Sequence, residues 1–155
     1  MVGTLTKLQL SSLAALGSAG LLAGAFIFQF FDYAPCKMCI WQRYPHVIAV
    51  IIGVLALKFR ASLVMLAGAA AAFTTAAIGL FHAGVEQGFW EGPSTCSSGA
   101  IDNLSADDLM EQIMSAPLVR CDEIPWELFG ISMAGWNGIL SLGLAMIWLL
   151  AARRA

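Results

Sequence analysis

Residues 62–81 read SLVMLAGAAAAFTTAAIGLF, a run of 20 residues without a charged side chain. An α-helix crosses a hydrocarbon core about 30 Å thick with roughly 20 apolar residues, so this run predicts a membrane span. Working outward from it, we find two further uncharged runs and a shorter apolar one with Arg43 near its start, and the four predicted spans are residues 10–31, 41–57, 62–81 and 132–152. The sequence therefore predicts an all-α membrane protein, a bundle of four transmembrane helices that forms a single integral membrane domain over residues 1–155.

The composition agrees with a membrane protein and argues against other classes. Of the 155 residues, 59% are hydrophobic and 12% are charged, whereas soluble proteins have about 45–50% apolar and about 25% charged residues. Intrinsic disorder requires few apolar residues. Binding to nucleic acid is favoured by a basic surface, and this chain has a net charge of −2. We therefore expect the lipid bilayer, and no nucleic acid, as a partner.

The charged residues differ in sign between the two sides of the predicted bundle. One side carries basic residues and no acidic residue, namely Lys7, Lys58, Arg60, Arg153 and Arg154. By the positive-inside rule this side is cytoplasmic, so both termini are expected in the cytoplasm. All ten Asp and Glu residues lie on the other side. Two loops then face outward, a short one over residues 32–40 and a long one over residues 82–131.

The long outward loop is predicted to contain one short amphipathic helix. Ser105 has the character of a helix N-cap and is followed by acidic residues, which favour a helix N-terminus. An apolar stripe at helical spacing follows, and Pro117 is expected to end the helix. We expect this helix to rest on the membrane surface or on the bundle.

All four cysteines fall in the outward loops, where an oxidising compartment lets disulfides form and persist. Cys36 and Cys39 form a C-x-x-C motif in the short loop, and Cys96 and Cys121 lie in the long one. Such a motif can be a redox pair, half of a zinc site or a haem attachment site. Haem attachment fails because Ile40, not histidine, follows Cys39. A tetrahedral zinc site from both loops is compatible with the spacing, but an oxidising compartment opposes four reduced thiols, so no metal is expected.

A redox pair fits the surroundings of Cys39 better. Pro45 is best accommodated in the first turn of a helix, so Cys39 is expected near the N-terminus of the second span. A helix N-terminus and a nearby cation both lower the pKa of a thiol, and Arg43 can supply that cation. The alternative for Arg43 is an interfacial arginine that extends to the lipid headgroups.

Two histidines lie near the ends of spans. His82 is predicted to close the third span on the outward side. It is either an ordinary interfacial histidine or a group that donates a hydrogen bond or proton to a ligand held between helix ends. For His46, inside the second span, we expect a structural role, and we assign no specific role to Gln29 or Gln42.

Two cysteine pairs in one compartment suggest an electron relay through mixed disulfides. Cys96 and Cys121 could instead form a purely structural disulfide. In a relay, the outer pair would deliver electrons to Cys36 and Cys39 at the membrane. That inner pair then needs a membrane acceptor, and a lipid-soluble quinone accepts two electrons, as many as a dithiol gives. Arg43 could stabilise the oxyanion that develops on the quinone.

The stretch CKMCIWQRYP over residues 36–45 resembles the DsbB family of bacterial disulfide-bond formation proteins. The resemblance extends over nearly the whole chain. It includes the four spans, the stretch from His82 to Cys96, and the run CDEIPWELFG over residues 121–130 that leads into the last span. The resemblance implies a protein of the bacterial inner membrane with its cysteines on the periplasmic side.

The resemblance also implies a set of functional residues. Cys96 and Cys121 would form the disulfide that a periplasmic thioredoxin-fold oxidase of the DsbA type attacks. Cys36 and Cys39 would take over the electrons and reduce ubiquinone or menaquinone. Cys39 would be the thiolate in contact with the quinone ring, and Arg43 and His82 match positions assigned to quinone binding.

Two alternatives to this quinone-dependent enzyme remain open. One is a relative of the vitamin K epoxide reductase group, which shares the logic of four helices but resembles this chain less after the C-x-x-C motif. The other is a structural membrane subunit with two disulfides, which should resist mild reduction and lack quinone-dependent thiol oxidation.

Overall fold

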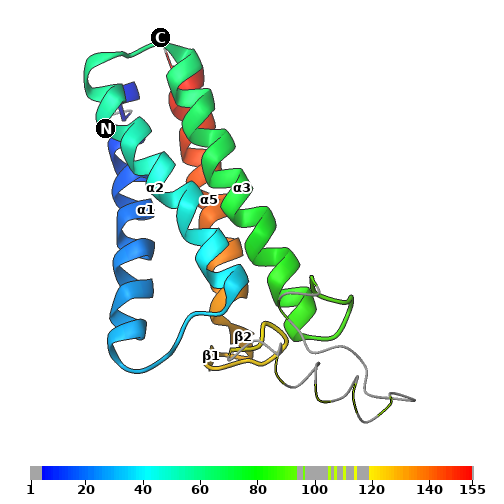
Figure 1. Ribbon diagram of the computed structural model, residues 1–155. Helices are drawn as coiled ribbons and strands as arrows, with labels where there is room; N and C mark the ends of the chain where they lie inside the picture. Colours follow the sequence, from blue (N-terminus) through cyan, green and yellow to red (C-terminus); the bar gives the residue numbers. More distant parts are fainter. Residues whose placement is uncertain are drawn as a thin grey trace.

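The computed structural model describes residues 5–93, 96, 105, 107, 110, 114 and 119–154. Within these residues, four helices are long and apolar enough to cross a membrane, and they run side by side as one bundle (Figure 1). They are α1 (Lys7–Phe30), α2 (Lys37–Lys58), α3 (Ser62–Glu86) and α5 (Met133–Arg153). The predicted all-α bundle with four membrane-spanning helices is therefore confirmed.

Helices α3 and α5 pack closely because small residues face each other. A Cβ atom on Gly79 would lie 2.9 Å from the backbone nitrogen of Gly138, and one on Gly68 would lie 2.6 Å from the ring of Trp148. Trp148 itself is fully buried, within a cluster of small and apolar side chains. Small residues let backbones approach, so that dispersion contacts hold helices together where lipid provides no hydrophobic force between them.

The two ends of the bundle differ (Figure 1). Both chain termini and the connection between α2 and α3 lie at one end. There Lys7 Nζ donates hydrogen bonds to the Arg60 carbonyl oxygen at 3.3 Å and to Ser62 Oγ at 3.4 Å. The connection between α1 and α2 lies at the opposite end, beside a short hairpin. The side chains that the sequence singled out for chemistry belong to this second end.

The start of α2 differs from the sequence-based prediction. The helix begins at Lys37 rather than near residue 41, so Pro45 lies in its interior and not in its first turn. The physical reason is a cap: Cys36 is the N-cap residue, and its Sγ accepts a hydrogen bond from the Cys39 backbone N–H at 3.2 Å. Cys39 and Arg43 consequently lie one helical turn apart on one face.

The third span is also longer than predicted. Helix α3 continues beyond residue 81 to Glu86, so His82 is a helical residue and does not belong to the outward loop. In this extra helical turn, the side chains of His82 and Glu86 point into the bundle, where both are almost fully buried. The added turn is what gives α3 a part in the site.

A two-stranded hairpin, which the sequence analysis did not predict, leads into α5. Strand β1 (Glu127–Leu128) pairs antiparallel with β2 (Ile131–Ser132). The two turn residues, Phe129 and Gly130, both have positive φ values, 54° and 73°, as a type I′ turn requires. Ser132 then caps α5 by accepting a hydrogen bond from the Gly135 backbone N–H at 3.1 Å. Most of the amphipathic helix predicted from Ser105 to Pro117 lies outside the described residues.

Candidate redox site

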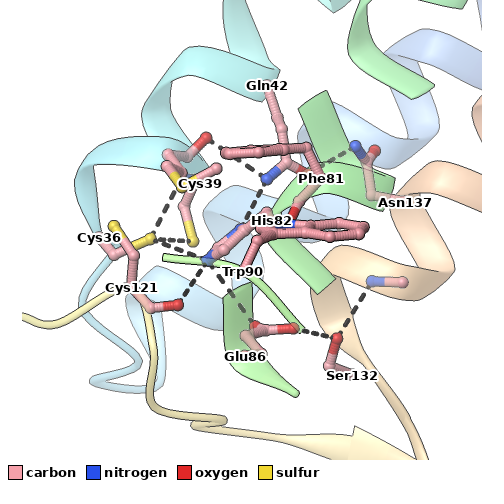
Figure 2. A network of polar contacts seen from close by, with 12 residues as sticks. Cys36, Cys39, Gln42, Phe81, His82, Glu86, Trp90, Cys121, Ser132 and Asn137 are labelled. Carbon is pink, nitrogen blue, oxygen red and sulfur yellow. Dashed lines mark hydrogen bonds and ion pairs between the residues drawn. The ribbon is translucent and has the colours of Figure 1, made fainter. Parts of the chain in front are cut away.

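Three parts of the chain bring the four cysteines together at the hairpin end of the bundle, and Figure 2 shows Cys36, Cys39 and Cys121. The four are free thiols in one buried cluster, with Cys39 only partly buried. Cys36 Sγ lies 2.9 Å from Cys39 Sγ. Cys36 Sγ, Cys121 Sγ and a ring nitrogen of His82 all lie within 4.8 Å of one another. The Cys121 backbone N–H donates to the Cys96 carbonyl oxygen at 2.8 Å. The sulfur atoms of both predicted pairs therefore belong to one site.

His82 lies against the sulfur atoms and is 2% exposed. Its Nε2 atom is 3.5 Å from Cys36 Sγ and 3.1 Å from the Cys121 carbonyl oxygen. Its Nδ1 atom is 2.9 Å from Gln42 Nε2. With the Gln42 amide donating to Nδ1, the proton of the neutral imidazole sits on Nε2. The Nε2–H group then donates a hydrogen bond to the Cys121 carbonyl oxygen. The geometry thus links His82 to the cysteines directly.

Glu86 contributes a buried carboxylate to the same site. Its Oε1 atom is 3.8 Å from His82 Nε2, and both side chains are 2% exposed. Its Oε2 atom accepts a hydrogen bond from Ser132 Oγ (Figure 2). Burial of a carboxylate is costly unless it is hydrogen-bonded, so the hydrogen bond from Ser132 explains how the group is tolerated there.

A second polar network lies deeper between the helices. Asn137 on α5 donates from Nδ2 to Gln42 Oε1 at 2.7 Å and to Thr75 Oγ1 at 3.2 Å. Its Oδ1 atom lies 2.9 Å from His46 Nε2. Sequence reasoning missed Asn137, Thr75 and Glu86 as members of this region. The signal that could have found the first two is a polar side chain within an otherwise apolar span.

A cavity of about 430 Å³ lies next to the sulfur cluster, between α1, α2, α5 and the hairpin. Most of its lining is apolar, with contributions from Phe28, Trp126, Leu128, Phe129 and Trp136. Polar and sulfur groups line it as well, from Cys39, Gln42, Arg43, His46 and Asn137. His82 is not among the lining residues, because its ring is turned toward Cys36 and Cys121.

Arg43 is held at this cavity by groups of α1. Its Nη1 donates to Gln29 Oε1 at 2.8 Å and its Nη2 to the Ala25 carbonyl oxygen at 3.4 Å. The guanidinium carbon is 5.0 Å from the centre of the Phe26 ring, a cation–π distance. The buried Nε atom has no hydrogen-bond partner among the described residues. A buried donor without a partner is costly, so this atom favours a ligand with an acceptor oxygen.

The environment changes the acidity of two cysteines outside the spans. Contact with the Cys39 sulfur, together with burial, raises the pKa of Cys36. Burial, followed by contact with Cys121, raises the pKa of Cys96 to about 12. A thiol with a raised pKa is a poor leaving group in thiol–disulfide exchange. Both sulfurs are therefore suited to remain in a disulfide while their partner sulfur leaves.

Four membrane-spanning helices with two cysteine pairs clustered at one end define a membrane thiol protein. The chain belongs to the DsbB family, because the family described as "Disulfide bond formation protein DsbB" matches residues 7–151. It is thus a membrane protein of disulfide bond formation, and the resemblance noted from the motifs is confirmed.

Individual relatives agree with the family match. The chain is 31% identical over 140 residues to "Disulfide bond formation protein B" of Shewanella sp., and the aligned region covers 84% of this chain and 78% of the relative. It is 30% identical over 159 residues to the protein of the same name from Albidiferax ferrireducens, covering 90% and 87%. It is also 26% identical over 130 residues to an uncharacterized protein of Rickettsia prowazekii, covering 78% and 73%. No solved structure matches the chain.

Proposed function

We propose that this protein is a quinone-dependent thiol oxidoreductase of the bacterial inner membrane that reoxidises a periplasmic DsbA-type thiol oxidase. Membership of the DsbB family supports a disulfide-generating activity. The observation that carries the proposal is the approach of Cys36 Sγ and Cys121 Sγ to within 4.8 Å. This distance joins one cysteine of each pair, as an electron relay requires.

The relay begins with both pairs oxidised. A thiolate of the partner attacks Cys96 Sγ, forms a mixed disulfide and releases Cys121 as a thiolate. Cys121 attacks Cys36 Sγ, so that a Cys36–Cys121 disulfide forms and Cys39 leaves as a thiolate. The partner's second thiolate then attacks its own mixed-disulfide sulfur, which leaves the partner oxidised and releases Cys96.

The released Cys96 completes the exchange within the protein. It attacks Cys121 Sγ, restores the Cys96–Cys121 disulfide and frees Cys36. Two electrons from the partner now reside on Cys36 and Cys39 as a dithiol. Oxidation of this dithiol restores the Cys36–Cys39 disulfide and the starting state, so that no thiol is consumed in a cycle.

The acidity of the cysteines supports this order of attack. Because the pKa of Cys96 is raised to about 12, Cys96 leaves slowly, which favours Cys121 as the leaving sulfur in the first step. The raised pKa of Cys36 likewise favours departure of Cys39 in the second step. Cys39 lies in the first turn of α2, where the helix N-terminus stabilises a negative charge.

The residues around the cavity fit a quinone. Its apolar walls suit a hydrophobic ring, and the unpartnered Nε of Arg43 suits a carbonyl oxygen. Cys39 and Arg43 line the cavity together, so they are the residues that would hold the ring. A bound quinone would supply an acceptor for two electrons and two protons. Direct contact of His82 with the quinone stays a prediction, and its bonds to the sulfur cluster favour a role in orienting Cys36 and Cys121.

Purified protein with reduced DsbA-type partner and added quinone tests the proposal, with quinone absorbance as the readout. We expect turnover in the wild type and none in Cys36→Ser or Cys39→Ser. Cys96→Ser should block electron entry from the partner, while a small dithiol that reduces Cys36–Cys39 directly should still support quinone reduction. Equal rates in the wild type and in Cys39→Ser would refute the assignment, and turnover of a naphthoquinone epoxide would favour the vitamin K epoxide reductase alternative.

A further inference from the structure

We propose that the reduced protein binds one thiophilic divalent ion, with Zn²⁺ as the reference, through Cys36, Cys121 and His82. The three donor atoms come from the start of α2, from the segment before the hairpin and from α3. All three residues are more than nine-tenths buried. The ion is not a cofactor of the relay in this proposal, because it occupies the sulfur atoms that the relay uses.

The spacing of the donors suits a tetrahedral ion. Bonds of about 2.3 Å to sulfur and about 2.0–2.1 Å to nitrogen imply a separation of about 3.6 Å between a sulfur and a nitrogen ligand and about 3.8 Å between two sulfurs. Cys36 Sγ and His82 Nε2 are 3.5 Å apart, and all three donor atoms lie within 4.8 Å of one another. Ligation therefore requires movements of about 1 Å or less and leaves a fourth position open.

The neighbours of His82 can support a metal-bound imidazole after one side-chain amide turns. Such a histidine usually donates its second ring N–H to an oxygen atom, which fixes the ring and its tautomer. Gln42 Nε2 lies 2.9 Å from His82 Nδ1, so ligation through Nε2 of the histidine requires its proton to move to Nδ1 and the Gln42 amide to turn its Oε1 atom to the ring, away from Asn137 Nδ2. Glu86, 3.8 Å from Nε2, adds an acidic group beside the cation. The cluster thus has a donor set and supporting groups from two helices, α2 and α3, and from the segment before the hairpin (Figure 2).

Binding depends on the redox state of the protein. A disulfide at Cys36 or at Cys121, whichever its partner, removes a ligand from the ion. When the reduced protein takes up Zn²⁺, both thiols release their protons to solvent and become thiolates. The ion therefore binds only the reduced state and holds the relay there until a chelator removes it.

Direct metal binding tests the proposal without partner or quinone. The full chain in detergent micelles is reduced anaerobically, freed of reductant and titrated with Co²⁺, whose absorption bands report thiolate ligands, and Zn²⁺ is then added to displace it. We expect one ion per reduced chain and none for the oxidised chain. Stoichiometric binding by the oxidised chain, or none by the reduced chain, would overturn the proposal.

Variants identify the ligands. Loss of a residue that only hydrogen-bonds to a metal ligand costs about 10- to 100-fold in metal affinity. Loss of a thiolate ligand itself should cost more, so we expect Cys36→Ser and Cys121→Ser to weaken binding by at least about 100-fold. His82→Gln should weaken it by at least about 10-fold. Cys96→Ser is the matched control, with the same change in the same buried cluster outside the three ligands, and it should bind as the wild type does. Unchanged affinity in Cys121→Ser would assign the ion to the C-x-x-C pair instead and refute the site, provided circular dichroism shows an intact helical fold.

The inhibitory consequence rests on the proposed function, whereas the binding experiment does not. We expect Zn²⁺ added to the prereduced enzyme to stop thiol oxidation, and a chelator to restore it. If the protein lacks quinone-dependent activity, this second assay gives no turnover at all, while redox-dependent Co²⁺ binding persists. Turnover that continues with Zn²⁺ bound at one equivalent would contradict the competition between the ion and the relay.

Discussion

At the scale of single residues, Arg43 illustrates how the fold gives a common side chain a specific placement. An arginine near the end of a span can extend to the lipid headgroups. Here α1 directs the guanidinium to the cavity instead, through Gln29, the Ala25 carbonyl and the Phe26 ring. Sequence analysis placed Arg43 beside the redox motif but assigned no role to Gln29. Contacts between α1 and α2 leave no recognisable pattern in the spacing of residues along the sequence.

We therefore expect Gln29 to act as a positioning residue for Arg43, which can be tested apart from chemistry. A hydrogen bond within a protein contributes about 0.5–1.5 kcal/mol, so we expect Gln29→Leu to raise the KM for quinone about 2- to 10-fold with little change in kcat. Steady-state kinetics at saturating partner measure this. Gln9→Leu is the matched control, since Gln9 lies on the same helix and bonds the Thr6 backbone at the other end. A kcat loss without a change in KM would argue against positioning of the ligand.

The acidity of Cys96 gives a second prediction at this scale. With a pKa raised to about 12, the thiolate fraction of reduced Cys96 increases tenfold per pH unit throughout the range from pH 7 to pH 9. We expect its alkylation rate, measured by peptide mass spectrometry, to follow that slope without levelling off. Burial lowers the absolute rate but not the slope. The same cysteine in denaturant should level off near its ordinary pKa of about 8.5, and a plateau at that pH in the folded chain would contradict the burial argument.

At the scale of elements, the close approach of α3 and α5 depends on Gly79. A methyl group there would meet backbone atoms of α5, including the Gly138 nitrogen at 2.9 Å, which a side-chain rotation cannot relieve. Overpacking costs about 1–3 kcal/mol, so we expect Gly79→Ala to lower the midpoint of thermal unfolding in detergent by about 3–10 °C. Gly143→Ala on α5, where a Cβ meets nothing within 4 Å, should leave the midpoint unchanged or slightly higher. Equal melting of both variants would show that the helices can shift apart at little cost.

The same elements indicate what a single sequence can predict. Long apolar runs identified the four helices, because the bilayer thickness sets their length. The helix ends were less predictable: Pro45 suggested a start near residue 41, yet the Cys36 cap starts α2 earlier. The hairpin was missed because its strands have two residues each and its turn holds Phe129 at a positive φ, where glycine or asparagine would be expected.

The candidate site was predictable in part for a related reason. The motifs identified the four cysteines and Arg43, because their residue types carry the chemistry. The contacts between loops far apart in the sequence, such as that of Cys121 with Cys36 and His82, depend on how the helices pack. Asn137, which bridges α2, α3 and α5 through Gln42 and Thr75, became visible only in the assembled bundle.

At the scale of the whole molecule, the proposed relay requires the cysteine end of the bundle to face the periplasm. The positive-inside rule gives this orientation, because the opposite end carries Lys7, Lys58, Arg60, Arg153 and Arg154 without an acidic residue. The structure gathers both termini and the α2–α3 connection at that basic end (Figure 1). An inverted bundle would expose the thiols to the reducing cytosol, where disulfides do not persist.

Labelling in intact cells tests this orientation. In a variant whose four cysteines are replaced by alanine, we expect a membrane-impermeant maleimide to label Glu127→Cys, because Glu127 is exposed in the hairpin. Arg60→Cys, equally exposed at the opposite end, should react only after the inner membrane is broken. The cysteine-free parent controls for background, and its helical circular dichroism shows whether the bundle persists without the sulfur cluster. Labelling of Arg60→Cys in intact cells, with Glu127→Cys protected, would show that the bundle has the opposite orientation. It would also remove the physical basis for a periplasmic thiol relay.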